Sequence, residues 1–82
     1  MKILLEIYVP ALGNTIEILV SLDLPVYQVL QLIKKLLVKL TEDRLNLSND
    51  ILLCYRENGK ILDINHFVYE LGLKNGSKLM II

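Results

Sequence analysis

The side chains best suited to covalent or acid–base chemistry are few in this sequence and lie far apart. It holds one cysteine, Cys54, and one histidine, His66. A nucleophile needs a neighbouring base, and no motif surrounds either residue. Cys54 lies in an apolar stretch, where a thiol packs as a small hydrophobic group. His66 lies in a turn-rich segment and is interpreted as an exposed loop residue, with pH sensing as the alternative. We predict no catalytic residue and therefore no enzyme.

Metal and cofactor sites are not expected either. One cysteine and one histidine do not supply the ligand set of a zinc site. Asp43, Asp50 and Asp63 lie among loop residues without the spacing of a calcium loop. The four glycines mark turns and form no glycine-rich phosphate loop. We predict no metal and no cofactor.

Composition limits the class of partner and the compartment. The 82 residues make one domain, 1–82, and nine basic side chains balance nine acidic ones. Nucleic-acid binding normally requires a concentrated basic patch, so it is not expected. No apolar run reaches the roughly 18 residues of a membrane span, and Glu6 interrupts the apolar start. We expect a cytoplasmic protein with no direct membrane insertion.

Two alternating runs at the start predict an antiparallel hairpin with one buried face. Residues 3–9 and 15–22 alternate in hydrophobicity, and Pro10 with the segment 11–14 supplies the loop between them. The side chains expected to face the core are Ile3, Leu5, Ile7, Val9, Ile16, Ile18, Val20 and Leu22.

The period then changes to that of a helix of about four turns. Pro25 is favoured in a first helical turn, and we expect Asp23 or Leu24 to lie near the cap. Apolar residues at i, i+3 and i+4 spacing predict a core-facing stripe, made of Val26, Val29, Leu30, Ile33, Leu36, Leu37 and Leu40.

The second half of the chain reads as strands and turns. A polar connection over 41–50 leads to a strand over 51–56, which the dipeptide Asn58-Gly59 turns into a very short strand, Ile61-Leu62. Residues 63–70 predict one 3₁₀ turn around Phe67 and Val68. The dipeptide Asn75-Gly76 then precedes a closing strand over 78–82.

This order of hairpin, helix, strand, short strand, one-turn helix and final strand resembles the β-grasp fold of ubiquitin along the whole chain. The implied fold class is α+β, with a mixed four- to five-stranded sheet packed on one α-helix. In that family the last strand lies centrally, parallel to the first strand and beside the third. The run from Lys60 to Ile82, with V-Y-E-L-G-L-K-N-G-S-K-L-M-I-I at its end, is similar to the closing segment of the YukD/EsaB proteins. These are small ubiquitin-like proteins encoded with type VII secretion systems of Gram-positive bacteria.

The resemblance implies a non-catalytic accessory or adaptor protein that binds a component or regulator of the secretion machinery. It would be cytoplasmic and peripheral to a membrane secretion complex. Ubiquitin itself acts through a C-terminal Gly-Gly, whereas this sequence ends Leu79-Met80-Ile81-Ile82 inside the expected strand. We therefore expect no conjugation. The alternatives are a ubiquitin-like carrier or modifier, and a structural β-grasp subunit of an unrelated complex.

Alternation along the strands predicts an apolar binding patch on the sheet face opposite the helix. Its expected members are Leu4, Tyr8, Leu52, Cys54, Arg56, Lys78, Met80 and Ile82. Exposed patches of this kind mark interfaces, and the sheet face is the usual docking surface of the ubiquitin family. Three alternatives stay open: a strand register shifted by one, a homodimer interface, and partial cover by the loop at 45–47. A second candidate surface is the helix flank formed by Tyr27, Lys34 and Val38.

Overall fold

The computed structural model describes residues 1–41 and 51–82. Along the chain it contains β1 (Lys2–Val9), β2 (Asn14–Ser21), α1 (Val26–Leu40), β3 (Leu53–Tyr55), a 3₁₀ turn (Val68–Leu71) and β4 (Ser77–Ile81). The expected connection over 41–50 lies, apart from Thr41, outside the described residues.

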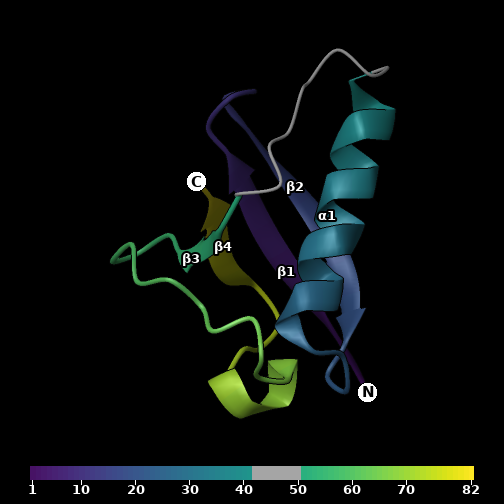
Figure 1. Ribbon diagram of the computed structural model, residues 1–82, viewed down its shortest axis with the longest axis vertical. Coiled ribbons are helices and arrows are strands. Elements are labelled where there is room, and N and C mark those ends of the chain that lie inside the picture. The colour runs from purple at the N-terminus through teal and green to yellow at the C-terminus, as the bar shows by residue number, and fades with distance from the viewer. Residues whose placement is uncertain (42–50) are drawn as a thin grey trace.

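The four strands form one mixed sheet in the order β2-β1-β4-β3 (Figure 1). The outer pairs β1–β2 and β3–β4 are antiparallel, and the central pair β1–β4 is parallel. Where the sequence predicts the very short strand Ile61-Leu62, the structure has an isolated bridge between Ile61 and Cys54. The β-grasp arrangement expected from the sequence, with the last strand between the first and the third, is confirmed.

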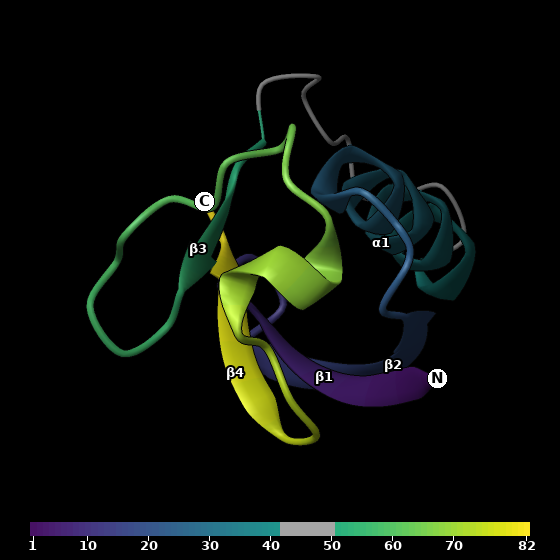
Figure 2. The same ribbon diagram turned by 90° about the horizontal axis from the view of Figure 1, so that it is seen from below.

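The hydrophobic core lies between the sheet and α1, which covers one sheet face (Figure 2). The expected alternation holds on β1, where Ile3, Leu5, Ile7 and Val9 are all buried. On β2 only Val20 is fully buried, because β2 is an edge strand; Ile16, Ile18 and Leu22 pack partly buried against the core. From the other half of the sheet, Leu53, Leu79 and Ile81 complete the core.

The start of α1 is capped by backbone groups of a distant loop, and Leu24 stands directly before the N-cap residue, near the cap as expected. Pro25 is the N-cap residue and makes no side-chain cap. The first free helical N–H groups find other acceptors: Val26 N–H donates to the carbonyl of His66 (2.9 Å), and Tyr27 N–H donates to the carbonyl of Ile64 (3.2 Å). Donors at a helix start need such partners, and here the segment around His66 supplies them.

At the other end of α1, the predicted core stripe is too long by one residue. Val26, Val29, Leu30, Ile33 and Leu37 are buried, and Leu36 is partly buried, but Leu40 is 58% exposed. Its angular position on the helix matches the stripe. Leu40 is nevertheless the last helical residue, about one turn past Leu37. It lies on the predicted face of the helix but beyond the end of the core.

The 3₁₀ turn is found where the sequence predicts it. Val68 is fully buried, and its N–H donates to the carbonyl of Leu24 (2.8 Å), which ties the turn to the segment before α1. The Glu70 carboxylate accepts a hydrogen bond from the Phe67 N–H (2.9 Å). Gly72 ends the turn at φ 68°, a left-handed conformation that favours glycine.

The Asn75-Gly76 turn sets the start of β4 against β1. The Leu4 N–H donates to Asn75 Oδ1 (2.8 Å), and the Gly76 N–H donates to the Leu4 carbonyl (2.8 Å). Gly76 has φ 84°. The turn is therefore fixed to the neighbouring strand before β4 begins.

Candidate protein-docking surface

The sheet face turned away from α1, here called the outer face, is built from the residues between the core positions of each strand. Strand register aligns these residues in rows across the sheet. One row runs Thr15–Tyr8–Met80–Cys54, and Ile61 extends it at the edge. The next row pairs Glu17 with Glu6 on β2 and β1, Glu6 with Lys78 on β4, and Lys78 with Arg56 just after β3.

The strand register is the expected one, so the alternative of a shift by one residue is wrong. Leu53, Leu79 and Ile81 face the core, and the residues between them face outward. Of the predicted patch residues, Leu52 and Ile82 are 39% and 54% exposed. They pair through two backbone hydrogen bonds of 3.0 Å, so they lie side by side at one end of the face.

The remaining predicted residues differ in how much surface they present. Leu4, Tyr8 and Met80 are half-buried, and Arg56 and Lys78 are exposed. The fold thus brings Tyr8, Arg56, Lys78 and Met80 together from segments that are distant in sequence, whereas the row of Glu6 and Lys78 separates Leu4 from Tyr8 and Met80.

Cys54 corrects the sequence prediction. It occupies the expected outward position opposite Met80, yet its side chain is 0% exposed. Its cross-strand neighbours, Met80 and Ile61, both carry much longer side chains than a thiol. Burial raises the pKa of the Cys54 thiol, which therefore stays protonated and apolar. The Cys54 side chain therefore occupies an outward position but offers no exposed surface to a partner.

Arg56 links the two halves of the outer face. Its guanidinium carbon lies 4.3 Å from the centroid of the Tyr8 ring. Because β4 separates β3 from β1, the Arg56 side chain must cross the outer side of β4 to reach that ring. The contact is a cation–π interaction, and it places a positive charge beside the half-buried Met80.

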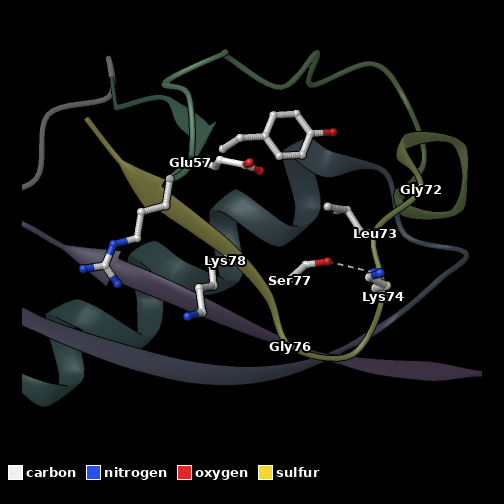
Figure 3. Close-up of a pocket in the computed structure, with 9 residues that line it drawn as sticks. Glu57, Gly72, Leu73, Lys74, Gly76, Ser77 and Lys78 are labelled. Carbon is white, nitrogen blue, oxygen red and sulfur yellow. Dashed lines mark hydrogen bonds between the residues drawn. The ribbon is translucent and has the colours of Figure 1, made fainter.

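A groove that the sequence did not reveal adjoins this end of the face. Its volume is about 700 Å³, and Figure 3 shows it between the turn after β3 and the segment that leads into β4. It is called the basic groove here because three of its lining side chains are Arg56, Lys74 and Lys78. The other lining residues are Tyr55, Glu57, Gly72, Leu73, Gly76 and Ser77.

Two hydrogen bonds hold the walls of the basic groove in place. Ser77 Oγ accepts a hydrogen bond from the Lys74 N–H (2.9 Å), drawn as a dashed line in Figure 3. The Tyr55 hydroxyl donates to the Leu71 carbonyl (3.3 Å) and so links β3 to the 3₁₀ turn. Sequence patterns could not find the groove, because its two walls are some twenty residues apart and meet only through the β3–β4 pairing.

Two residues of the second predicted surface, on the flank of α1, lie together beside a hollow. Tyr27 and Lys34 line a separate hollow of about 500 Å³ together with Leu30, Gln31, Ile51, Leu52 and Ile64. Val38, the third predicted member, does not line it. A stacked aromatic pair, Phe67 and Tyr69, is also exposed near the start of α1, with ring centroids 5.5 Å apart. The sequence analysis did not single out this pair as a surface.

His66 lies between two carboxylates, with Asp63 and Glu70 each 3.4 Å from one of its ring nitrogens. Hydrogen bonding by the Phe67 N–H, with a smaller contribution from His66, holds the pKa of Glu70 below its usual value. Within residues 1–41 and 51–82, no group of three or more His, Cys, Asp or Glu side chains is arranged to hold a metal ion. Over the same residues, no helix has the length and apolarity of a membrane span.

Comparisons with known proteins identify the fold. No protein-family model matches the chain, and no curated protein matches it. Among solved structures, it is similar to the ubiquitin-like domain of the type VII secretion protein EccD1 of Mycobacterium tuberculosis (TM-score 0.77, 11% identity, 100% of this chain and 98% of that chain). It is also similar to the ubiquitin-like domain of EccD5 from Mycobacterium xenopi (TM-score 0.77, 18% identity, 100% and 93%).

Two further similarities show how widely the fold is used. A chain of the ESX-5 inner membrane complex matches with a TM-score of 0.70 and 20% identity over 99% of this chain, which spans 20% of that larger chain. A chain of a toluene 4-monooxygenase complex matches with a TM-score of 0.75 and 10% identity, over 99% and 96%. At these identities the likeness concerns the fold, which is the ubiquitin-like β-grasp: a mixed sheet packed on one helix, with a 3₁₀ turn.

Proposed function

We propose that this protein is a non-catalytic ubiquitin-like accessory protein of a type VII secretion system, of the YukD/EsaB kind, and acts by binding another protein. The observation that carries the proposal is the outer face, where Tyr8, Met80, Leu52 and Ile82 present apolar surface beside the charges of Arg56 and Lys78. Grouped apolar surface with a polar rim is the usual composition of a docking site.

Two further observations favour secretion as the setting. Ubiquitin-like domains of EccD1 and EccD5 share the fold over essentially the whole chain. The similar chain in the ESX-5 inner membrane complex suggests the location that we propose, a cytoplasmic protein at the periphery of a membrane secretion complex. The partner would be a component or a regulator of that machinery.

A gene deletion in the native host tests the secretion role. Export of the small WXG-type substrates is measured by immunoblotting of culture medium and cells, with a plasmid copy of the gene as the control. We expect export to fall in the deletion strain and to return with the plasmid. Undisturbed export would contradict the proposal and favour a β-grasp subunit of an unrelated complex, such as the monooxygenase complex that contains a similar chain.

A further inference from the structure

We infer that the basic groove receives an acidic, extended segment of the partner protein. This inference rests on the proposed function, because it names the chemistry of the partner that would cover the adjoining outer face. It adds a second contact region that the apolar patch alone does not predict.

The basic groove carries more positive than negative side chains. The chain has a net charge of zero, yet Arg56, Lys74 and Lys78 all line this one hollow, against Glu57 as the single acidic lining residue. In the described part of the chain, none of these three basic side chains forms an ion pair. Basic groups clustered around a concave surface attract carboxylates, with the field strengthened by the low-dielectric wall behind them.

The positions of the charges favour an extended segment over a single small anion. In Figure 3, Lys74 lies on one side of the basic groove and Lys78 on the other, and Arg56 lines the same hollow. Carboxylates spaced along a peptide could therefore contact both sides, with an apolar residue between them over Leu73 and Tyr55. Lys74 stands on a turn that is already fixed to β1 through Asn75 and Gly76, so binding need not order it.

The same charges argue against a nucleic acid as the occupant. Binding to a phosphate backbone depends on many basic contacts along its length. Here three basic groups stand beside Glu57, and Glu6 Oε2 comes within 3.8 Å of the place where a Cβ on Gly76 would lie. Such a mixed rim suits a peptide, which carries isolated carboxylates, better than a uniform polyanion.

The basic groove is continuous with the proposed docking patch. Arg56 lines the groove and also stacks on Tyr8, which stands opposite Met80 on the outer face. A partner that covers Met80 would therefore meet the basic rim without crossing open surface.

The test uses a short synthetic peptide in which glutamates flank a central leucine, titrated into the ¹⁵N-labelled full chain and followed by amide shifts. The control peptide carries glutamine in place of each glutamate. We expect shifts at residues 55–57 and 72–78 with the acidic peptide only, weaker at high salt because exposed charges are screened. Lys74→Glu combined with Lys78→Glu should weaken binding about tenfold, since the two substitutions replace attracting charges on the rim by repelling ones. The matched control, Lys35→Glu with Lys39→Glu on α1, should leave it unchanged.

Several results would overturn the inference. These are no shift at the groove residues, equal weakening by the α1 control variant, or tighter binding of a single-stranded oligonucleotide or of anionic lipid vesicles than of the peptide. The same amide shifts on concentrating the protein alone would assign the groove to a second copy of the chain instead. This assay is independent of secretion, so loss of peptide binding with an intact export phenotype, or the reverse, separates failure of the inference from failure of the proposed function.

Discussion

The Arg56 guanidinium lies over the Tyr8 ring, with 4.3 Å between the guanidinium carbon and the ring centroid, although β4 lies between β1, which carries Tyr8, and β3, which Arg56 directly follows. This contact spans the middle of the outer face. It fixes the rim charge next to Met80 and restrains the mutual position of the two sheet halves.

Loss of this contact should lower the free energy of unfolding slightly, and the effect of changing one side chain should depend on the presence of the other. We expect Tyr8→Leu and Arg56→Gln each to reduce the free energy of unfolding, with a coupling energy of about 0.5–1 kcal/mol in a double-mutant cycle, as for exposed cation–π pairs. Urea denaturation of the two single variants and the double variant measures it. Additive effects would show that the two side chains do not interact in solution.

Substitutions at the end of β4 and just after it should cost more unfolding free energy on the core face than on the outer face. Leu79 is fully buried, so Leu79→Ala should cost about 2–5 kcal/mol of unfolding free energy. Ile82 is half-exposed, and Ile82→Ala should cost about 0.5 kcal/mol or less. Chemical denaturation of both variants provides the comparison, and similar losses at the two positions would contradict the register.

The Cys54 thiol should be unreactive in the native protein. It has no exposed surface, and burial raises its pKa, so little of the reactive thiolate forms at neutral pH. We expect Ellman's reagent to label it slowly in buffer and quickly in denaturing urea. Rapid labelling of the native protein would show instead that the Cys54 thiol is exposed on the outer face.

Glu70 should make stability depend on pH in the acidic range. Its pKa is lowered in the folded state, chiefly by the hydrogen bond from the Phe67 N–H. A lowered pKa stabilises the fold above the pKa of the unfolded chain, and this stabilisation is lost as the pH falls through the folded-state value. The wild type should therefore exceed Glu70→Gln in thermal midpoint at neutral pH, and the difference should shrink in acid.

A second variant at the same position identifies the cause. Glu70→Asp retains the negative charge, but its shorter side chain does not reach the Phe67 N–H in the observed geometry. If the hydrogen bond is responsible, Glu70→Asp should have a lower thermal midpoint than the wild type at neutral pH, whereas Glu70→Gln retains an amide oxygen that can accept the same hydrogen bond. Wild-type behaviour of Glu70→Asp would instead assign the effect to charge alone.

Local periodicity predicted most of the fold because each element buries one face. The alternation in β1, the stripe on α1 and the turn at Gly76 follow from backbone geometry that neighbouring residues determine. The parallel pairing of β4 with β1 is non-local, and the resemblance to ubiquitin supplied it.

Whether a side chain is exposed was harder to predict than the face of the strand or helix on which it lies. Alternation placed Cys54 on the outer face correctly but could not show that, between its cross-strand neighbours Met80 and Ile61, it has no exposed surface. Helical spacing likewise gave Leu40 the right angle without showing that it lies past the core. The basic groove depends on two distant loops, so no sequence window contains it. The suggested cover by residues 45–47 falls outside the described part of the chain.

The most direct test of the central claim is export of WXG-type substrates in a deletion strain that carries the Met80→Asp variant. A charge at this half-buried position on the outer face should block docking. The buried side chains of β4 that face the core are not changed. The matched control is Leu32→Asp, which places the same charge on α1 at a side chain that is 46% exposed. Circular dichroism and accumulation of both proteins are checked first. We predict that Met80→Asp fails to restore export and that Leu32→Asp restores it; full export with Met80→Asp would contradict the outer face as the docking surface.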